Sequence, residues 1–246
     1  LMKNKLSFAA TSVIAMLLSA CGMAVVPGSG KVVNETRDVH GYDQIVFSAP
    51  GELTIVQNGD EGLLIEADDN LMQYIKTSVH GDVLYIYVEP EIINSPYSQP
   101  IQYTLDVDAL TRVTLNGSGD IRAGVLIASN LDFDLNGSGD ILIGAVTSES
   151  TTIDLDGSGQ CRVNSLMTNQ LRTSIDGSGD VRIKDAIAKT ATLEIDGSGT
   201  LTMRDIIADT ANMKVDGSGD SMLSGEVQHQ AIAIHGSGSY NARDLQ

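Results

Sequence analysis

The chain has 246 residues, a formal net charge of −17 at neutral pH, 4% aromatic residues and no tryptophan. Such an acidic surface repels phosphate backbones, which excludes DNA and RNA as partners. With few aromatic side chains and 25 glycines, small aliphatic residues must supply most of the buried area, so a thin, layered core is favoured over a bulky globular one.

Residues 1–20 have the features of a targeting segment. Two lysines provide a basic start, and the apolar run over 6–18 is too short to span a membrane comfortably. The run ends at Leu18-Ser19-Ala20-Cys21, which resembles the bacterial lipobox, where the cysteine is acylated and becomes the mature N-terminus. We therefore expect a lipoprotein signal peptide that is removed and a lipid attached to Cys21.

Lipid attachment at Cys21 makes the mature chain a membrane-anchored protein, with residues 21–30 as a short tether. Glycine, not aspartate, follows the cysteine, which by analogy with enterobacterial sorting favours the outer membrane and a periplasmic or surface-exposed location. The alternative is an ordinary signal peptide cut near Ala20, with Cys21 unmodified.

Residues 31–110 alternate apolar and polar side chains with the period of two that is typical of strands, as in 52–56 and 83–88. The segment from Pro90 to Pro100 is expected to be a loop, because proline cannot donate to a strand ladder. No helix longer than one or two turns is predicted. We interpret this part as irregular N-terminal coils or a cap on the repeats that follow.

Residues 111–246 contain a repeat of about 20 residues. Gly-Ser-Gly recurs seven times at spacings of 20, 20, 20, 20, 20 and 19 residues, with alternating apolar residues on both sides. A strand-turn-strand unit that cannot bury its apolar face alone must stack on copies of itself. We predict an all-β fold in which 31–246 forms a single-stranded β-helix, or solenoid, with about 20 residues per coil. The turns lie at 117–119, 137–139, 157–159, 177–179, 197–199, 217–219 and 236–238.

Each Gly-Ser-Gly is expected to form a tight turn in which glycine supplies a positive φ. An Asn, Asp or His precedes each turn, and stacked coils align these side chains as a ladder. The ladder has a structural role if it caps the turn amides, and it is also a possible ligand face. Its members are Asn116, Asn136, Asp156, Asp176, Asp196 and Asp216.

Carboxylates stacked in this way repel one another unless something compensates. One compensation is capping by turn amides together with the flanking Arg122, Arg162 and Arg182; the other is calcium, as in the Asp-rich nonapeptide repeats. The period of 20 differs from 9 or 18, and asparagine replaces the acid in two coils, which favours capping. No metal site and no cofactor are therefore predicted.

Catalytic motifs are missing from the sequence. The repeated serines lack the Gly-x-Ser-x-Gly spacing of a nucleophile elbow, and neither a dinucleotide fingerprint nor a P-loop is present. Cys161 is the one thiol besides Cys21, and it belongs to an otherwise aliphatic column, which predicts a buried apolar role. No catalytic residues are predicted.

Several motifs together resemble one family of bacterial surface proteins. The chain is similar to the putative auto-transporter adhesin, head GIN domain family, over roughly 31–240. The resemblance rests on Gly28-Ser29-Gly30-Lys31, the strands Ile45-Val46-Phe47 and Leu53-Thr54-Ile55, and the repeated Gly-Ser-Gly-Asp turns. The resemblance implies a single-stranded right-handed β-helix. It implies no catalytic residues.

The predicted function is that of a cell-envelope lipoprotein that presents a β-helical surface for adhesion or for binding a protein or glycan. The alternatives are a structural or envelope-stress component without a specific ligand, and a polysaccharide-acting β-helix enzyme. Such an enzyme needs a cleft with paired carboxylates, whereas the acids here are spread along a ladder and no coil carries an insertion that would form the wall of a cleft.

Overall fold

The computed structural model describes residues 26–93, 95–242 and 245–246. The predicted signal peptide and Cys21 lie outside the described residues. Strands account for 66% and helix for 3%, and the strands form the turns of a solenoid about 20 residues apart. In the described part, no helix is both long enough and apolar enough to cross a membrane.

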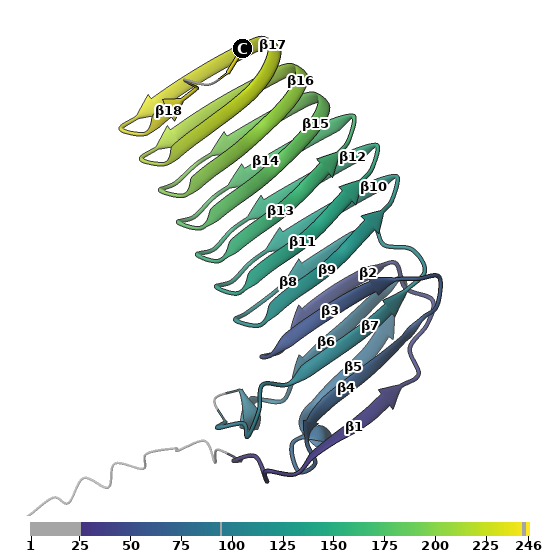
Figure 1. Ribbon diagram of the computed structural model, residues 1–246. Helices are drawn as coiled ribbons and strands as arrows, with labels where there is room; N and C mark the ends of the chain where they lie inside the picture. Colours follow the sequence, from purple (N-terminus) through teal and green to yellow (C-terminus); the bar gives the residue numbers. More distant parts are fainter. Residues whose placement is uncertain (1–25, 94, 243–244) are drawn as a thin grey trace, which may run out of the picture.

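Each repeat contributes one strand to each of two facing sheet surfaces, joined by a Gly-Ser-Gly turn (Figure 1). In the last three coils a single long strand bends round the opposite corner and serves both surfaces. The strands are β8 (Arg112–Leu115), β9 (Asp120–Ile127), β10 (Asn130–Leu135), β11 (Asp140–Thr147), β12 (Ser150–Leu155), β13 (Gln160–Met167), β14 (Gln170–Ile175), β15 (Asp180–Ile195), β16 (Thr200–Gly217) and β17 (Asp220–Gly236).

We call the surface of β9, β11, β13 and the first halves of β15, β16 and β17 the β9 face. The surface of β8, β10, β12, β14 and the second halves of β15, β16 and β17 is the β10 face. From β8 to β16, neighbouring strands on each face are parallel and paired at an offset of 20 residues, so that Phe133 lies beside Ile153 and Ile141 beside Cys161. Because the side-chain period is two, this even offset keeps every column on one side of its sheet. The predicted β-helix is confirmed.

The core lies between the two faces and consists of stacked apolar columns. Burial of one large aliphatic side chain in such a column stabilises the folded state by about 1.5–3 kcal/mol. Cys161 is 1% exposed and belongs to such a column, which confirms its predicted burial. The column that precedes the first six Gly-Ser-Gly turns is at most 1% exposed and comprises Leu115, Leu135, Leu155, Ile175, Ile195 and Val215.

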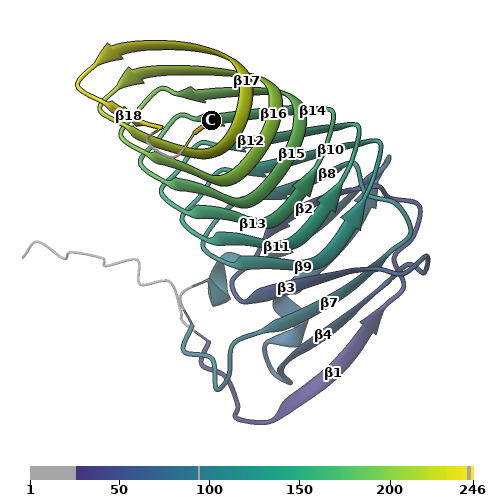
Figure 2. The same ribbon diagram turned by 45° about the horizontal axis from the view of Figure 1, so that its top comes forward.

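The N-terminal strands stack in an order that differs from their order in the chain (Figure 2). β2 (Gln44–Ser48) lies between β6 (Val83–Val88) and β8, and β3 (Glu52–Gln57) lies between β7 (Gln102–Val107) and β9; all these pairs are parallel. The β2–β3 coil is therefore inserted between the later β6–β7 coil and the first Gly-Ser-Gly coil.

Antiparallel strands close this end of the solenoid. β4 (Gly62–Asp68) pairs with β7, β1 (Val32–Arg37) pairs with β4, and β5 (Ile75–His80) pairs with β6. Two short 3-10 turns, η1 (Met72–Tyr74) and η2 (Pro90–Ile92), connect the strands here. The parallel stack is thus covered at its N-terminal end.

The buried Asp68 fastens the chain that precedes β1 to this cap. Its carboxylate accepts hydrogen bonds from the Gly30 amide (2.9 Å), the Ser98 amide (2.9 Å) and the Ser98 hydroxyl (2.5 Å). The bond from the Ser98 hydroxyl is the largest cause of the lowered pKa of Asp68. Residues 28–30, at the end of the expected tether, are therefore docked on the cap.

Close approach between stacked turns, and not positive φ, is the main reason for the Gly-Ser-Gly glycines. At Gly157 a Cβ atom would lie 2.1 Å from the carbonyl oxygen of Gly137, and the other stacked turns are similarly tight. The expectation of a positive φ was therefore wrong for most coils. The Gly-Ser-Gly glycines that do have one are Gly117, Gly217 and Gly236.

The shorter spacing of the last repeat produces a β-bulge. The register between β16 and β17 shifts between Met203 and Ile206, where Asp205 has a φ of 48°. A bulge places an extra residue on one of two paired strands, which lets a coil that is one residue shorter remain in register. After β17, β18 (Ser239–Asn241) pairs with the start of that strand.

Candidate binding surfaces

The stacked Gly-Ser-Gly turns form one edge of the solenoid, which we call the turn edge. The structure brings the predicted ladder together there, with five of its six side chains exposed and Asp216 partly buried. The Asn136 amide donates a hydrogen bond to Oδ1 of Asn116 over 3.0 Å. Among the described residues, no ion pair within 4.0 Å reaches Asp156, Asp176 or Asp196, so these carboxylates are screened by solvent.

The ladder carboxylates do not cap the turn amides in the described part of the chain, contrary to expectation. Those amides are already used between coils, since the Ser158 amide donates to the Gly137 carbonyl oxygen over 3.0 Å. Capping falls instead to the acid after the turn. Asp120 accepts from the Asp140 amide at 3.0 Å, and Asp140 accepts from the Gln160 amide at 3.1 Å.

Asp216, the last ladder residue, is the exception because two side chains, Lys214 and His235, reach its carboxylate. Lys214 Nζ lies 2.6 Å from one carboxylate oxygen, and His235 Nδ1 lies 3.0 Å from the other. The hydrogen bond from Lys214 is the main cause of the lowered pKa of Asp216. This end of the turn edge is therefore partly neutralised, whereas its middle is acidic.

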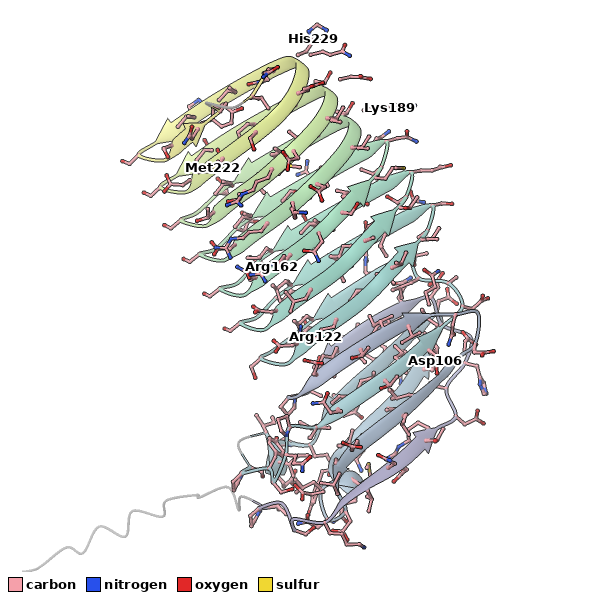
Figure 3. The ribbon with its side chains drawn as sticks, viewed as in Figure 1. Asp106, Arg122, Arg162, Lys189, Met222 and His229 are labelled. Atoms are coloured by element: carbon pink, nitrogen blue, oxygen red, sulfur yellow. The ribbon has the colours of Figure 1, made fainter. Side chains whose placement is uncertain are left out.

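The arginines predicted to flank the ladder lie on the β9 face, where Figure 3 labels Arg122 and Arg162. Arg162 donates to Gln160 over 2.6 Å and Arg182 to Asp180 over 2.8 Å, within their own strands. Arg122 instead contacts Glu52 over 2.5 Å. The sequence could not indicate that last pair, because the neighbour of β9 on that side is β3, 70 residues away.

The corner opposite the turn edge carries a second surface that the sequence analysis did not identify. Outward-facing residues at the ends of the β9-face strands stack there. Four of them are large apolar residues with exposed side chains: Ile127 (62% exposed), Met167 (53%), Ile187 (47%) and Ile207 (53%). We call this set the corner column. Thr147 and Glu226 complete it.

An open groove follows this corner, with the corner column on one side and polar side chains beside it, among them Lys189, Asp209 and Gln228. Figure 3 labels Lys189 at this corner. A sequence signal does exist. Leu166-Met167 and Ile206-Ile207 place two apolar residues in succession, and the first of each pair is buried whereas the second faces solvent.

The described residues offer little for catalysis. No group of three or more His, Cys, Asp or Glu side chains in this part of the chain is arranged to hold a metal ion. Burial raises the pKa of the Cys161 thiol to about 12, so the nucleophilic thiolate is scarcely populated at neutral pH. Among the described residues, the turn edge carries exposed charge and the corner carries exposed apolar area.

Comparisons with known proteins agree with this arrangement. A family model described as a putative auto-transporter adhesin, head GIN domain, matches residues 41–205 and 184–246. A putative adhesin from Bacteroides fragilis superposes with a TM-score of 0.80 at 18% identity, over 88% of this chain and 99% of that one.

A putative lipid binding protein from Parabacteroides distasonis superposes with a TM-score of 0.76 at 22% identity, over 88% of this chain and 98% of that one. A putative adhesin from Parabacteroides merdae gives 0.66 at 16% identity, over 89% and 99%. These likenesses concern the fold. None of the curated proteins compared with the chain matches it.

Proposed function

We propose, from the premise that the chain belongs to the putative auto-transporter adhesin, head GIN domain family, that it is a lipid-anchored envelope protein whose β-helix binds a protein or glycan. Membership of an adhesin family suggests a cell-surface or envelope protein with a binding role. The anchor is proposed at Cys21 and the contact surface at the corner column. Catalysis has no part in the proposal.

The exposed aliphatic side chains of the corner column carry the proposal. Thr147 occupies the same column in unbroken register with Ile127 and Met167, so the fold accepts a polar residue there. Ile127, Met167 and Ile207 are nonetheless more than half exposed. Contiguous exposed apolar residues rimmed by polar ones are typical of interaction sites.

The scaffold suits a binding surface because it is ordered before any ligand arrives. Each coil is hydrogen-bonded to its neighbours through parallel ladders at a constant offset, so the corner residues are held at fixed spacing along the solenoid. A preorganised surface loses little conformational entropy when it binds. A partner that is extended along the solenoid axis gains the most contact from such a row.

The experiment compares cells that display the full chain with cells that display matched variants, on an array of immobilised glycans and extracellular proteins. The test variant replaces Met167, Ile187 and Ile207 with threonine, the residue already present at position 147. The control variant replaces Asp156, Asp176 and Asp196 with asparagine on the turn edge. Retention by the array should fall at least about tenfold for the corner variant and stay unchanged for the control.

Two results would contradict the proposal. Equal retention of the corner variant and the parent would remove the corner column as the contact surface. The anchor is tested separately with Cys21→Ala, which should release the chain from the membrane fraction. If that variant fractionates with membranes as the parent does, lipid attachment at Cys21 is wrong.

A further inference from the structure

The C-terminal end of the solenoid is only half covered. The start of β17 pairs with β18, and the Gln246 amide donates to the Gly225 carbonyl oxygen over 2.9 Å. The second half, Gln228–Gly236, pairs with β16 on one side, and no strand among the described residues pairs with its other side. We call this segment the open strand; it forms the outermost layer of the β10 face (Figures 1 and 2).

Two isoleucines on the open strand are the last members of core columns, and no further coil covers them in the described structure. Ile232 pairs with Met213 and Ile234 with Val215, both of which are buried. Ile232 and Ile234 themselves are 44% and 40% exposed. They lie at inward-facing positions, so only another layer at this end can bury them.

The open strand also lacks the usual protection of a sheet edge. Natural edge strands carry charges, often lysine, that prevent pairing with another chain. Residues 227–242 contain no Asp, Glu, Lys or Arg, in a chain whose net charge is −17. Each earlier Gly-Ser-Gly-coil strand on the β10 face carries at least one charge, from Arg112, Asp132, Asp134, Asp154, Arg172, Glu194 or Lys214.

We infer that a second copy of this chain packs end to end against the open strand. The net charge of the whole chain favours a basic partner, but the open strand has no acidic residue for a basic partner to bind. Two acidic chains, in contrast, can approach each other only where neither carries local charge, and the open strand is such a place. A two-fold arrangement brings the same end of each chain together, so each copy contributes an open strand and its two isoleucines. This contact is separate from ligand binding at the corner column.

The test is native mass spectrometry of the full chain, purified in mild detergent at about 10 μM. The parent should have twice the mass of one chain. Ile232→Lys places a charge in the uncovered core column, and it should raise the dissociation constant at least about tenfold. Ile207→Lys, at an exposed isoleucine of the corner column, is the matched control and should remain dimeric.

Ile232→Lys could act by unfolding the last coil, so a second variant changes only outward positions. Ala231→Lys combined with Ala233→Lys leaves the core columns intact and adds like charges to both copies, and it should also give monomers while its circular dichroism matches the parent. A monomeric parent, a dimer that survives in both strand variants, or a complex with a different protein would each overturn the inference.

Discussion

Substitution of Thr173 tests how much an unpaired polar group in the solenoid core lowers the free energy of unfolding. Its side chain is 0% exposed and its hydroxyl has no hydrogen-bond partner within the described structure. The residues stacked on either side in its column are Ile153 and Leu193, both buried and apolar. Replacing Thr173 with valine keeps the shape of the side chain and exchanges the unpaired hydroxyl for a methyl group.

The expected effect follows from the cost of an unpaired buried hydroxyl, about 1–3 kcal/mol. Thr173→Val should therefore raise the free energy of unfolding by about 1–2 kcal/mol. Thr151 is the matched control, because it is 1% exposed and its hydroxyl lies 2.7 Å from the Ser148 hydroxyl. Thr151→Val removes a hydrogen bond and should lower the free energy of unfolding by about 1 kcal/mol.

Urea unfolding followed by circular dichroism measures both changes, provided that the m value stays constant. For a chain of this size, each kcal/mol corresponds to a shift of about 2–4 °C in Tm. The same chemical substitution should thus move stability in opposite directions at two buried sites. If Thr173→Val is destabilising, or if both variants shift stability alike, the assignment of an unpaired hydroxyl at Thr173 is wrong.

Three further predictions concern the repeats. Gly157→Ala should lower stability by about 2 kcal/mol or more, because its Cβ would lie 2.1 Å from the Gly137 carbonyl oxygen, whereas Gly124→Ala, with open space around it, should change little in the same urea assay. Cys161, whose burial raises the thiol pKa to about 12, should resist maleimide at pH 8 until urea is added, and rapid labelling of the native protein would contradict the assigned register. Asp176→Asn should change stability by less than about 0.5 kcal/mol, and millimolar calcium should leave Tm within about 1 °C, because the exposed carboxylate has no ion-pair partner within the described structure; a large rise in Tm that a chelator abolishes would contradict both.

The repeat made most of the C-terminal architecture predictable from sequence. A constant spacing of 20 residues and a period of two on both sides of each Gly-Ser-Gly determine the coil, its register and the burial of Cys161. These are local properties that recur, so each copy supports the same interpretation. The 19-residue spacing of the last repeat was visible as well, but its structural form, the bulge at Asp205, depends on how two particular coils pair.

Contacts between distant segments could not be predicted in the same way. Nothing in the sequence places β2 and β3 between strands that follow them in the chain, and therefore nothing indicates that Arg122 meets Glu52. The role of the turn glycines was misjudged for a related reason. Positive φ is a property of one residue, whereas the clash that excludes a side chain at Gly157 arises from the coil next to it.

The surfaces of the coil differ in how far the fold constrains their sequence. Stacking contacts at the turn edge require glycine, and the inward columns require apolar side chains, so composition there says little about function. Outward columns are free, because a change at an outward position alters neither register nor core. Exposed aliphatic residues that recur in successive coils at a free position are therefore explained by something outside the fold, which is the reason for assigning contact with other molecules to the corner column. The outward column in the middle of the β9 face illustrates that freedom, since it contains Arg122, Leu142, Arg162, Arg182, Thr202 and Met222.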